Sequence, residues 1–311
     1  MVNINDTKFR QILLNRMKEL CRPMQPEPTR VDPQLSRMPG IRVVIFDIYG
    51  TLLTSEAGEI GSLSLSNAVM AQSALQDAGF RFLDKRTGKR AVERLHHWID
   101  SEHRNAQKKG IQYPEVDILE IWKLVLNDLA REKLIRSEKH AQHEMFDTRA
   151  VQRLAVEYEC RVNPTWPMPD LRITLKGLLK TGIKLGIVSN AQFYTSLVME
   201  SFYETGWIEK FFEPGLCIES WQVGESKPSA RLIRLILEQL AARYGLTPDK
   251  TLCIGNDMLN DITPAIQMGC KTALFAGDRK SLRLRADDPH CSDITPDLII
   301  TELKQLLDVL C

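Results

Sequence analysis

The stretch that decides the fold is Ile41-Arg-Val-Val-Ile-Phe-Asp-Ile-Tyr-Gly-Thr-Leu-Leu-Thr-Ser55, in which an apolar run ends in one carboxylate followed by a glycine. Val43 to Phe46 are β-branched or aromatic without polar alternation, which predicts a strand buried on both faces, as in a parallel sheet. Asp47 then falls at the carboxyl end of this strand, where ligands bind in open α/β sheets. Gly50 allows a sharp turn just past it. The sequence therefore predicts an α/β fold with a polar site at Asp47.

Two further apolar strands are expected to end in polar residues at the same edge of the sheet. The strand expected over residues 183–189 ends in Ser189, and Asn190 follows it. A hydroxyl at a strand end before a helix can hold a phosphate or carboxylate oxygen. Residues 251–254 run into Gly255-Asn-Asp-Met-Leu-Asn-Asp261. A shorter strand candidate, residues 215–218, leads to Lys227-Pro228, just before a helical stretch.

The spacing of Asp257 and Asp261 predicts a metal site. Residues four apart share one face of a helical turn, where two carboxylates repel unless a cation lies between them. Mg2+ prefers hard oxygen ligands and is often held by one or two carboxylates together with water and substrate oxygens. Lys227 supplies a second positive charge that can neutralise both a nucleophile and an anionic substrate.

The four elements, in this order, resemble the motifs of the haloacid dehalogenase-like hydrolase superfamily, and the resemblance covers about residues 41 to 276. It implies a Rossmann-like three-layer α/β/α core with a parallel sheet. It further implies Asp47 as the nucleophile, Ser189 as the second-motif group and Lys227 as the third-motif lysine. The site residues implied are Asp47, Tyr49, Ser189 and Lys227 for catalysis, Thr51, Ser189, Asn190 and Lys227 for substrate, and Asp47, Tyr49, Asn256, Asp257 and Asp261 for Mg2+.

Tyr49 departs from the family pattern, because phosphatases of this family carry a second Asp there as the general acid. Its main-chain carbonyl can still bind Mg2+, but a phenol with an unperturbed pKa of about 10 is a poor proton donor near neutral pH. The Asp-x-Tyr-Gly-Thr variant is typical of 2-haloacid dehalogenases, which need no metal. Asn256 also admits a second alignment, since the family tolerates Asp-to-Asp spacings of four and five.

Three functions follow from these residues. The first is a Mg2+-dependent phosphatase that cleaves a small phosphate ester through an aspartyl phosphate, and the carboxylate pair favours it because that pair would repel a haloacid without a cation. The second is a metal-independent 2-haloacid dehalogenase that forms an aspartyl ester. The third is a binding or scaffold protein with little turnover, against which the intact Asp47, Lys227 and Asp261 argue.

The long gap between residues 55 and 183 predicts an inserted domain. Helices are expected at about residues 65–79, 88–109, 115–133 and 146–159, and their position resembles the C1 cap of the family. The expected organisation is a helix and Pro-rich linker over residues 1–40, a core formed by 41–55 and 161–311, and a cap over 56–160.

The composition limits the kinds of binding partner that are expected. The formal net charge is +1, from 41 basic and 40 acidic residues, so no overall field attracts nucleic acid or a membrane. A small anionic molecule is the expected substrate. No signal peptide or apolar span is evident, and the seven scattered cysteines fit free thiols, so a cytoplasmic protein is expected. An apolar stripe in the N-terminal helix, from Phe9 to Leu20, could serve a homodimer.

Overall fold

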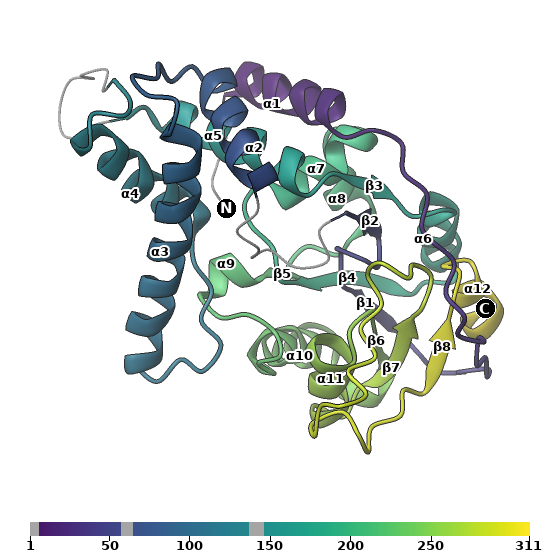
Figure 1. The fold of residues 1–311 in the computed structure, drawn as a ribbon. Coiled ribbons are helices and arrows are strands. Elements are labelled where there is room, and N and C mark those ends of the chain that lie inside the picture. The colour runs from purple at the N-terminus through teal and green to yellow at the C-terminus, as the bar shows by residue number, and fades with distance from the viewer. Residues whose placement is uncertain (1–5, 57–64, 137–145) are drawn as a thin grey trace.

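The computed structural model describes residues 6–56, 65–136 and 146–311, and its centre is a six-stranded parallel sheet (Figure 1). Helices flank both faces, so the predicted α/β Rossmann-like fold is confirmed. The strands, in spatial order, are β5 (Cys217–Glu219), β4 (Lys184–Ser189), β1 (Val43–Phe46), β6 (Thr251–Gly255), β7 (Lys271–Phe275) and β8 (Leu298–Ile300). The strand order places β1 between β4 and β6, the three strands whose ends carry polar residues.

Strand β1 is buried on both faces, as its unbroken apolar sequence predicts. Val44 and Phe46 belong to the hydrophobic cluster on one face, and Val43 and Ile45 belong to the cluster on the other. Alternate residues of a strand point to opposite faces, so a strand covered by helices on both sides has no position for a polar side chain. The first polar side chain, Asp47, therefore comes where the strand ends.

Two sets of helices cover the sheet. The helices on the Phe46 face are α6 (Leu171–Lys180), α7 (Thr195–Phe202), α8 (Trp207–Phe211) and α12 (Gln305–Leu310), and α1 (Thr7–Leu20) packs on α7. Those on the Ile45 face are α10 (Arg231–Tyr244) and α11 (Thr263–Gln267). Short turns complete the described part of the chain: α9 (Ser220–Val223), a 3-10 turn (Pro248–Lys250) and a π-helical turn (Met258–Ile262).

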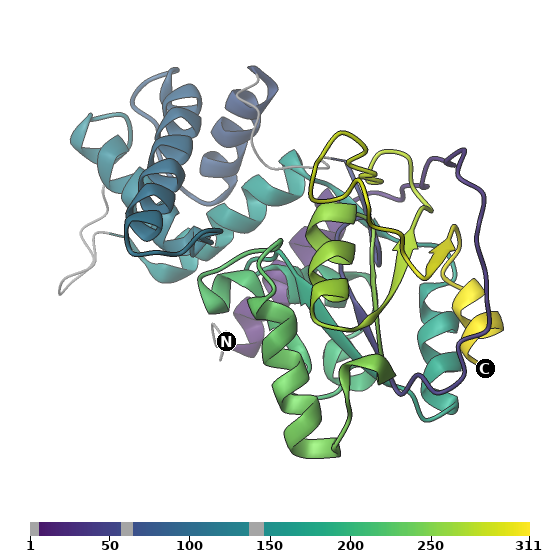
Figure 2. The same cartoon turned by 90° about the horizontal axis from the view of Figure 1, so that it is seen from below.

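In the described part of the segment between β2 (Leu53–Ser55) and β3 (Thr165–Pro167) there are four helices, and their positions agree with the four predicted helices. They are α2 (Leu65–Asp77), α3 (Thr87–Lys108), α4 (Ile118–Arg131) and α5 (Thr148–Val162). Figure 2 shows them gathered to one side of the sheet. Strands β2 and β3 pair antiparallel with each other, so the chain leaves and re-enters the core through one short ribbon. Strand β3 was not predicted, because Pro164, Pro167 and Pro169 made this segment look irregular.

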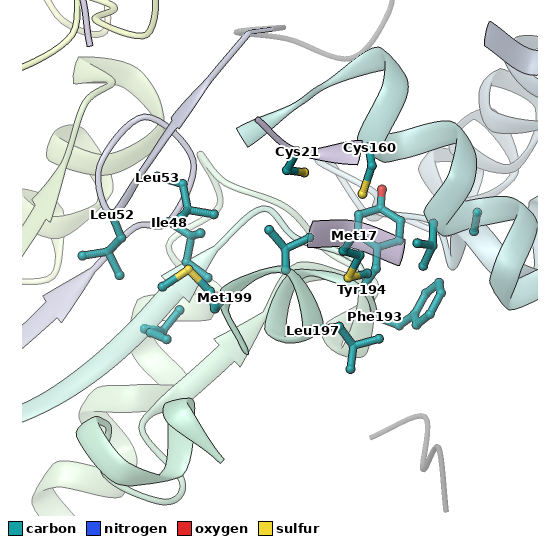
Figure 3. Close-up of a cluster of buried hydrophobic side chains, with 14 of the residues drawn as sticks. Met17, Cys21, Ile48, Leu52, Leu53, Cys160, Phe193, Tyr194, Leu197 and Met199 are labelled. Atoms are coloured by element: carbon teal, nitrogen blue, oxygen red, sulfur yellow. The ribbon is translucent and has the colours of Figure 1, made fainter. Parts of the chain in front are cut away.

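The N-terminal helix α1 packs against its own chain. Leu13, Leu14 and Met17 are buried, and α1 contacts α5 of the insertion and α7 of the core. Figure 3 shows Met17 close to Cys160 of α5 and to Tyr194. The apolar stripe suggested for a homodimer is therefore largely covered by intramolecular contacts, since burying an amphipathic face within the chain satisfies the same hydrophobic driving force.

The Pro-rich linker follows the edge of the core. Gln34 forms backbone hydrogen bonds with Ile299 of β8, and Thr29 Oγ1 donates to the carbonyl of Ala276. All seven cysteines are free thiols. Within the described ranges, no helix has the length and apolar character needed to span a membrane.

Candidate active site

The site begins where β1, β4 and β6 end side by side. The Asp47 amide still donates to the carbonyl of Ile254 at 2.9 Å, so the backbone at this residue is fixed by the sheet. The residue is 7% exposed, and its Oδ1 accepts a 2.9 Å hydrogen bond from Ser189 Oγ at the end of β4. The predicted meeting of the two strand ends therefore holds, and the Ser189 hydroxyl orients the carboxylate.

Lys227 connects the carboxylates of this site. Its Nζ lies 2.6 Å from Asp47 Oδ1 and 2.5 Å from Asp261 Oδ1. Both carboxylates touch one ammonium, so residues from β1 and from the turn after β6 form a single charged cluster. Asn190 fixes the backbone of Lys227, because its Oδ1 accepts from the Lys227 amide at 2.7 Å while its Nδ2 donates to the Lys227 carbonyl at 3.3 Å.

The charges within this cluster are not balanced. Burial lowers the pKa of Lys227, but attraction to Asp261 and Asp47 outweighs it and the net pKa is raised, so the ammonium keeps its proton. Burial raises the pKa of Asp261 to about 7, and the neighbouring Asp47 adds to this effect, although Lys227 opposes it. A single ammonium facing two buried carboxylates leaves room for a further positive charge.

The polar residues in the turn after β6 have different structural roles. A Cβ on Gly255 would lie 2.1 Å from Cγ of Asp261, so only glycine lets this carboxylate fold back against the strand end. Asp257 begins the π-helical turn: its Oδ1 accepts from the amides of Leu259 and Asn260. Its Oδ2 accepts from Arg285 at 2.7 Å.

Asn256 is held in a different way, through both ends of its amide. Its Oδ1 accepts from Thr51 Oγ1 at 3.1 Å, and its Nδ2 donates to the carbonyl of Ser281 at 2.7 Å. Among the described residues, no group of three or more His, Cys, Asp or Glu side chains is arranged to hold a metal. Any ion bound here must therefore take part of its coordination from main-chain carbonyls, amide oxygens, water or substrate.

A cavity of about 400 Å³ lies over the charged cluster. It extends from the strand ends toward the inserted helices and the segment that follows β4. The residues that line it are polar or charged except for Ala191: Asp47, Tyr49, Ser55, Glu115, Glu159, Asn163, Asn190, Ala191, Gln192, Tyr194, Lys227, Asn256, Asp257, Asn260, Asp261 and Arg283. A nucleophile, a lysine and a cavity lined by polar residues are the components expected of an enzyme acting on a small anionic molecule.

A family model described as a haloacid dehalogenase-like hydrolase matches residues 41–269. The chain belongs to the haloacid dehalogenase-like hydrolases. This agrees with the resemblance inferred from the four motifs and makes the protein a hydrolase.

Named relatives of this hydrolase include phosphatases. It is 26% identical over 242 residues to a phosphoglycolate phosphatase of Salmonella typhi, covering 76% of this chain and 81% of that one. It is 28% identical over 141 residues to a glyceraldehyde 3-phosphate phosphatase of Methanothermobacter thermautotrophicus, covering 45% of this chain but only 58% of that relative.

Among solved structures, a 2-haloacid dehalogenase from Pseudomonas syringae pv. Tomato DC3000 has a TM-score of 0.51 at 18% identity, covering 86% of this chain and 97% of the other. This likeness shows a shared fold, built around a parallel sheet.

Seven of the nine residues predicted from the sequence of this hydrolase line the cavity, namely Asp47, Tyr49, Asn190, Lys227, Asn256, Asp257 and Asp261. The other two, Ser189 and Thr51, are fully buried and lie outside the lining, because their hydroxyls donate to Asp47 and to Asn256. In this structure they position other site residues and do not face a substrate.

The Tyr49 side chain points to a neighbouring polar group of the core. Its hydroxyl lies 3.0 Å from Thr195 Oγ1, and burial raises its pKa well above its ordinary value. It therefore remains a neutral phenol that releases its proton reluctantly. The Tyr49 side chain therefore does not readily supply the proton that the second Asp supplies in phosphatases of this family.

Sequence reasoning missed the cavity-lining residues that lie outside the four motifs. Glu115, Glu159, Asn163, Gln192 and Tyr194 line it, although they come from the loop before α4, from the end of α5 and from the segment after β4. Glu159 lies in a helix whose pattern gives no sign that one carboxylate is buried. These residues meet only through the packing of the inserted helices on the core.

Proposed function

We propose that this protein is a Mg2+-dependent phosphatase that transfers the phosphoryl group of a small phosphate ester to Asp47 and then to water. The observation that carries the proposal is the buried Lys227 bridge between Asp47 and Asp261 beneath a polar cavity. Such a site can receive a tetrahedral anion once a cation offsets the second carboxylate. The phosphatase names of the curated relatives support the same reaction.

The residues present fit a magnesium ion. Asp47 and Asp261 offer two carboxylates that lie close together, since both contact one ammonium. The Tyr49 main-chain carbonyl and the Asn256 side-chain oxygen are further candidates, whereas Asp257 is already engaged by Arg285 and the start of the π-helical turn. When bound, Mg2+ would polarise the phosphoryl group and offset its charge.

The chain's own side chains account for the two chemical steps. Ser189 and Lys227 both contact Asp47 Oδ1, and none of the described residues forms a hydrogen bond to Oδ2, which is therefore available as the nucleophile. Its attack on phosphorus breaks the bond to the ester oxygen, and the leaving alkoxide takes a proton from water. A second water then hydrolyses the aspartyl phosphate and regenerates the Asp47 carboxylate.

The inserted helices α2 to α5 are proposed to act as a C1-type cap. Glu115 and Glu159 from this part of the chain line the same cavity as Asp47. A cap that covers a charged site excludes water, which strengthens the electrostatic interactions inside. The short β2–β3 ribbon is the natural place for the cap to move against the core.

The second candidate is a 2-haloacid dehalogenase, which Tyr49 favours. In this reaction Asp47 would attack carbon, and halide would leave without a metal. The substrate of such an enzyme carries a carboxylate, yet Asp257, Asp261, Glu115 and Glu159 line the cavity. This concentration of carboxyl groups opposes an anionic substrate unless a cation is bound.

The test is hydrolysis of p-nitrophenyl phosphate and of 2-chloropropionate by the purified protein, each with Mg2+ and with EDTA. Phosphate release that disappears in EDTA and in the Asp47→Asn variant is expected. Chloride release that EDTA does not affect would replace the phosphatase by the dehalogenase. No turnover of either compound, with an intact fold, would favour the scaffold function.

A further inference from the structure

Part of the cavity lining is a hydrogen-bond network centred on Glu159. Ser55 Oγ donates to Asn163 Oδ1 at 2.5 Å, and Asn163 Nδ2 donates to Glu159 Oε1 at 3.1 Å. Tyr194 OH donates to Glu159 Oε2 at 2.9 Å. We call these four residues the Glu159 network, and all of them line the cavity.

The direction of these bonds limits what the network can bind. A hydroxyl has one hydrogen, and those of Ser55 and Tyr194 are given to Asn163 and Glu159. Their oxygens therefore face the cavity as acceptors. The Glu159 carboxylate is itself an acceptor. Figure 3 shows the Tyr194 ring held in the apolar cluster beside Met17 and Cys160, which fixes the position of its hydroxyl oxygen.

The side-chain hydrogens of the neighbouring Gln192 and Ser220 are also already donated. Gln192 Nε2 donates to Glu115 Oε1 at 3.2 Å and to the Val116 carbonyl at 2.8 Å, which uses both of its hydrogens. Gln192 Oε1 accepts from the amide of Ile118. Ser220 Oγ donates to Glu115 Oε2 at 2.8 Å. Glu115 therefore adds a second carboxylate to this part of the cavity lining.

The cations that line the cavity belong to the charged cluster and to the segment beside the turn after β6. Among the described residues, the basic side chains of the lining are Lys227 and Arg283. Lys227 is engaged by Asp47 and Asp261. Arg283 forms backbone hydrogen bonds with Asn256 and Met258, which places it beside the turn after β6, where the phosphate is expected.

We infer that the alcohol portion of the substrate carries hydrogen-bond donors, hydroxyl or ammonium groups, that the Glu159 network accepts, and that esters bearing a carboxylate there are rejected. This inference rests on the proposed phosphatase function. A carboxylate has only acceptors, so beside Glu159 and Glu115 it would meet like charge and no available hydroxyl hydrogen. The substrate class is therefore a polyol or amino-alcohol phosphate, not the phosphate ester of a hydroxy acid.

Matched pairs of esters test this inference with the wild-type protein. Glycerol 3-phosphate and 3-phosphoglycerate differ by a hydroxymethyl group against a carboxylate, and erythritol 4-phosphate and erythronate 4-phosphate repeat the contrast at greater reach. O-phosphoethanolamine supplies the ammonium. Burial raises the pKa of Glu159, so the assays are run at alkaline pH, where its carboxylate is ionised. We expect kcat/KM to favour the polyol of a pair by at least about tenfold.

The Glu159→Gln variant links this preference to the network. It keeps the shape of the side chain but replaces one acceptor oxygen by a donor amide and removes the charge. The polyol-to-acid ratio should fall by at least about tenfold. The control is Glu200→Gln, another buried carboxyl, which pairs with Arg10 and lies outside the cavity lining. This control should leave the ratio unchanged.

The outcomes separate this inference from the proposed function. Phosphate release from p-nitrophenyl phosphate, with acid esters cleaved as fast as their polyol partners, would overturn the inference and leave the phosphatase standing. A similar loss of discrimination in Glu200→Gln would also overturn it. No phosphate release from any ester would overturn both. The wild-type ratios decide the matter even if Glu159→Gln does not fold.

Discussion

Replacing Lys227 by methionine should destabilise the metal-free protein strongly. Methionine keeps an unbranched side chain of similar length but removes the ammonium that contacts Asp47 and Asp261. The three side chains are only 5%, 8% and 7% exposed, so water cannot replace the lost charge. Removing one partner of a buried ion pair typically costs about 3–5 kcal/mol, and this magnitude is expected for the free energy of unfolding at alkaline pH.

The loss of unfolding free energy in Lys227→Met should increase with pH. The pKa of Asp261 is already raised to about 7, and removing Lys227 raises it further above the unfolded value. A carboxyl group of this kind costs the folded state nothing while it is protonated. The wild-type protein loses stability in the same way as the variant up to about pH 7, so the difference between the two proteins grows only above that pH, by about 1.4 kcal/mol per pH unit until the folded pKa of the variant is reached. Lys227→Met should therefore be best tolerated at acidic pH.

The measurement is equilibrium unfolding in urea with EDTA present, for both proteins across a pH series. The matched control is Lys271→Met, since Lys271 pairs with Asp297 at 2.9 Å but is 46% exposed. An exposed pair contributes about 0–1 kcal/mol. Equal losses in the two variants, or a Lys227→Met loss that does not grow with pH, would refute the argument that burial makes this lysine essential.

Three further predictions concern the metal and the leaving group. Mg2+ needs the Asp261 carboxylate ionised. The apparent Kd for Mg2+, measured by isothermal titration calorimetry, should therefore be constant above about pH 7 and rise about tenfold per pH unit below it. A Kd that decreases on acidification would contradict this. Asp261→Asn should weaken Mg2+ binding at least about tenfold. Asp257→Ala should instead lower the unfolding free energy by about 1 kcal/mol with little effect on Mg2+, because Asp257 caps the turn and pairs with Arg285; the reverse order would exchange their roles. Tyr49→Asp should raise kcat on alkyl phosphates relative to p-nitrophenyl phosphate by up to about 10²- to 10⁴-fold, and an unchanged ratio would show that no general acid is missing.

Much of the site was predictable because its residues lie within short motifs attached to strands. Asp47 follows an apolar run, and Lys227 and Asp261 follow at family intervals. Parallel strands bring their carboxyl ends to one edge of the sheet, so knowing the strands was enough to bring these side chains together. The details of hydrogen bonding were not predictable: Thr51 and Ser189 were expected to face the substrate, but they donate to Asn256 and Asp47.

The sequence by itself determined the parallel α/β core and the charged residues at its centre, because runs of consecutive residues encode both. Only the tertiary structure decided the rest of the cavity lining, where Ser55, Glu115, Glu159 and Tyr194 come from separate segments. Periodicity shows that one face of α5 is buried, but it cannot show that Glu159 meets Tyr194 there. That meeting depends on how the inserted helices pack on the core, and this is a property of long-range contacts that no local pattern encodes.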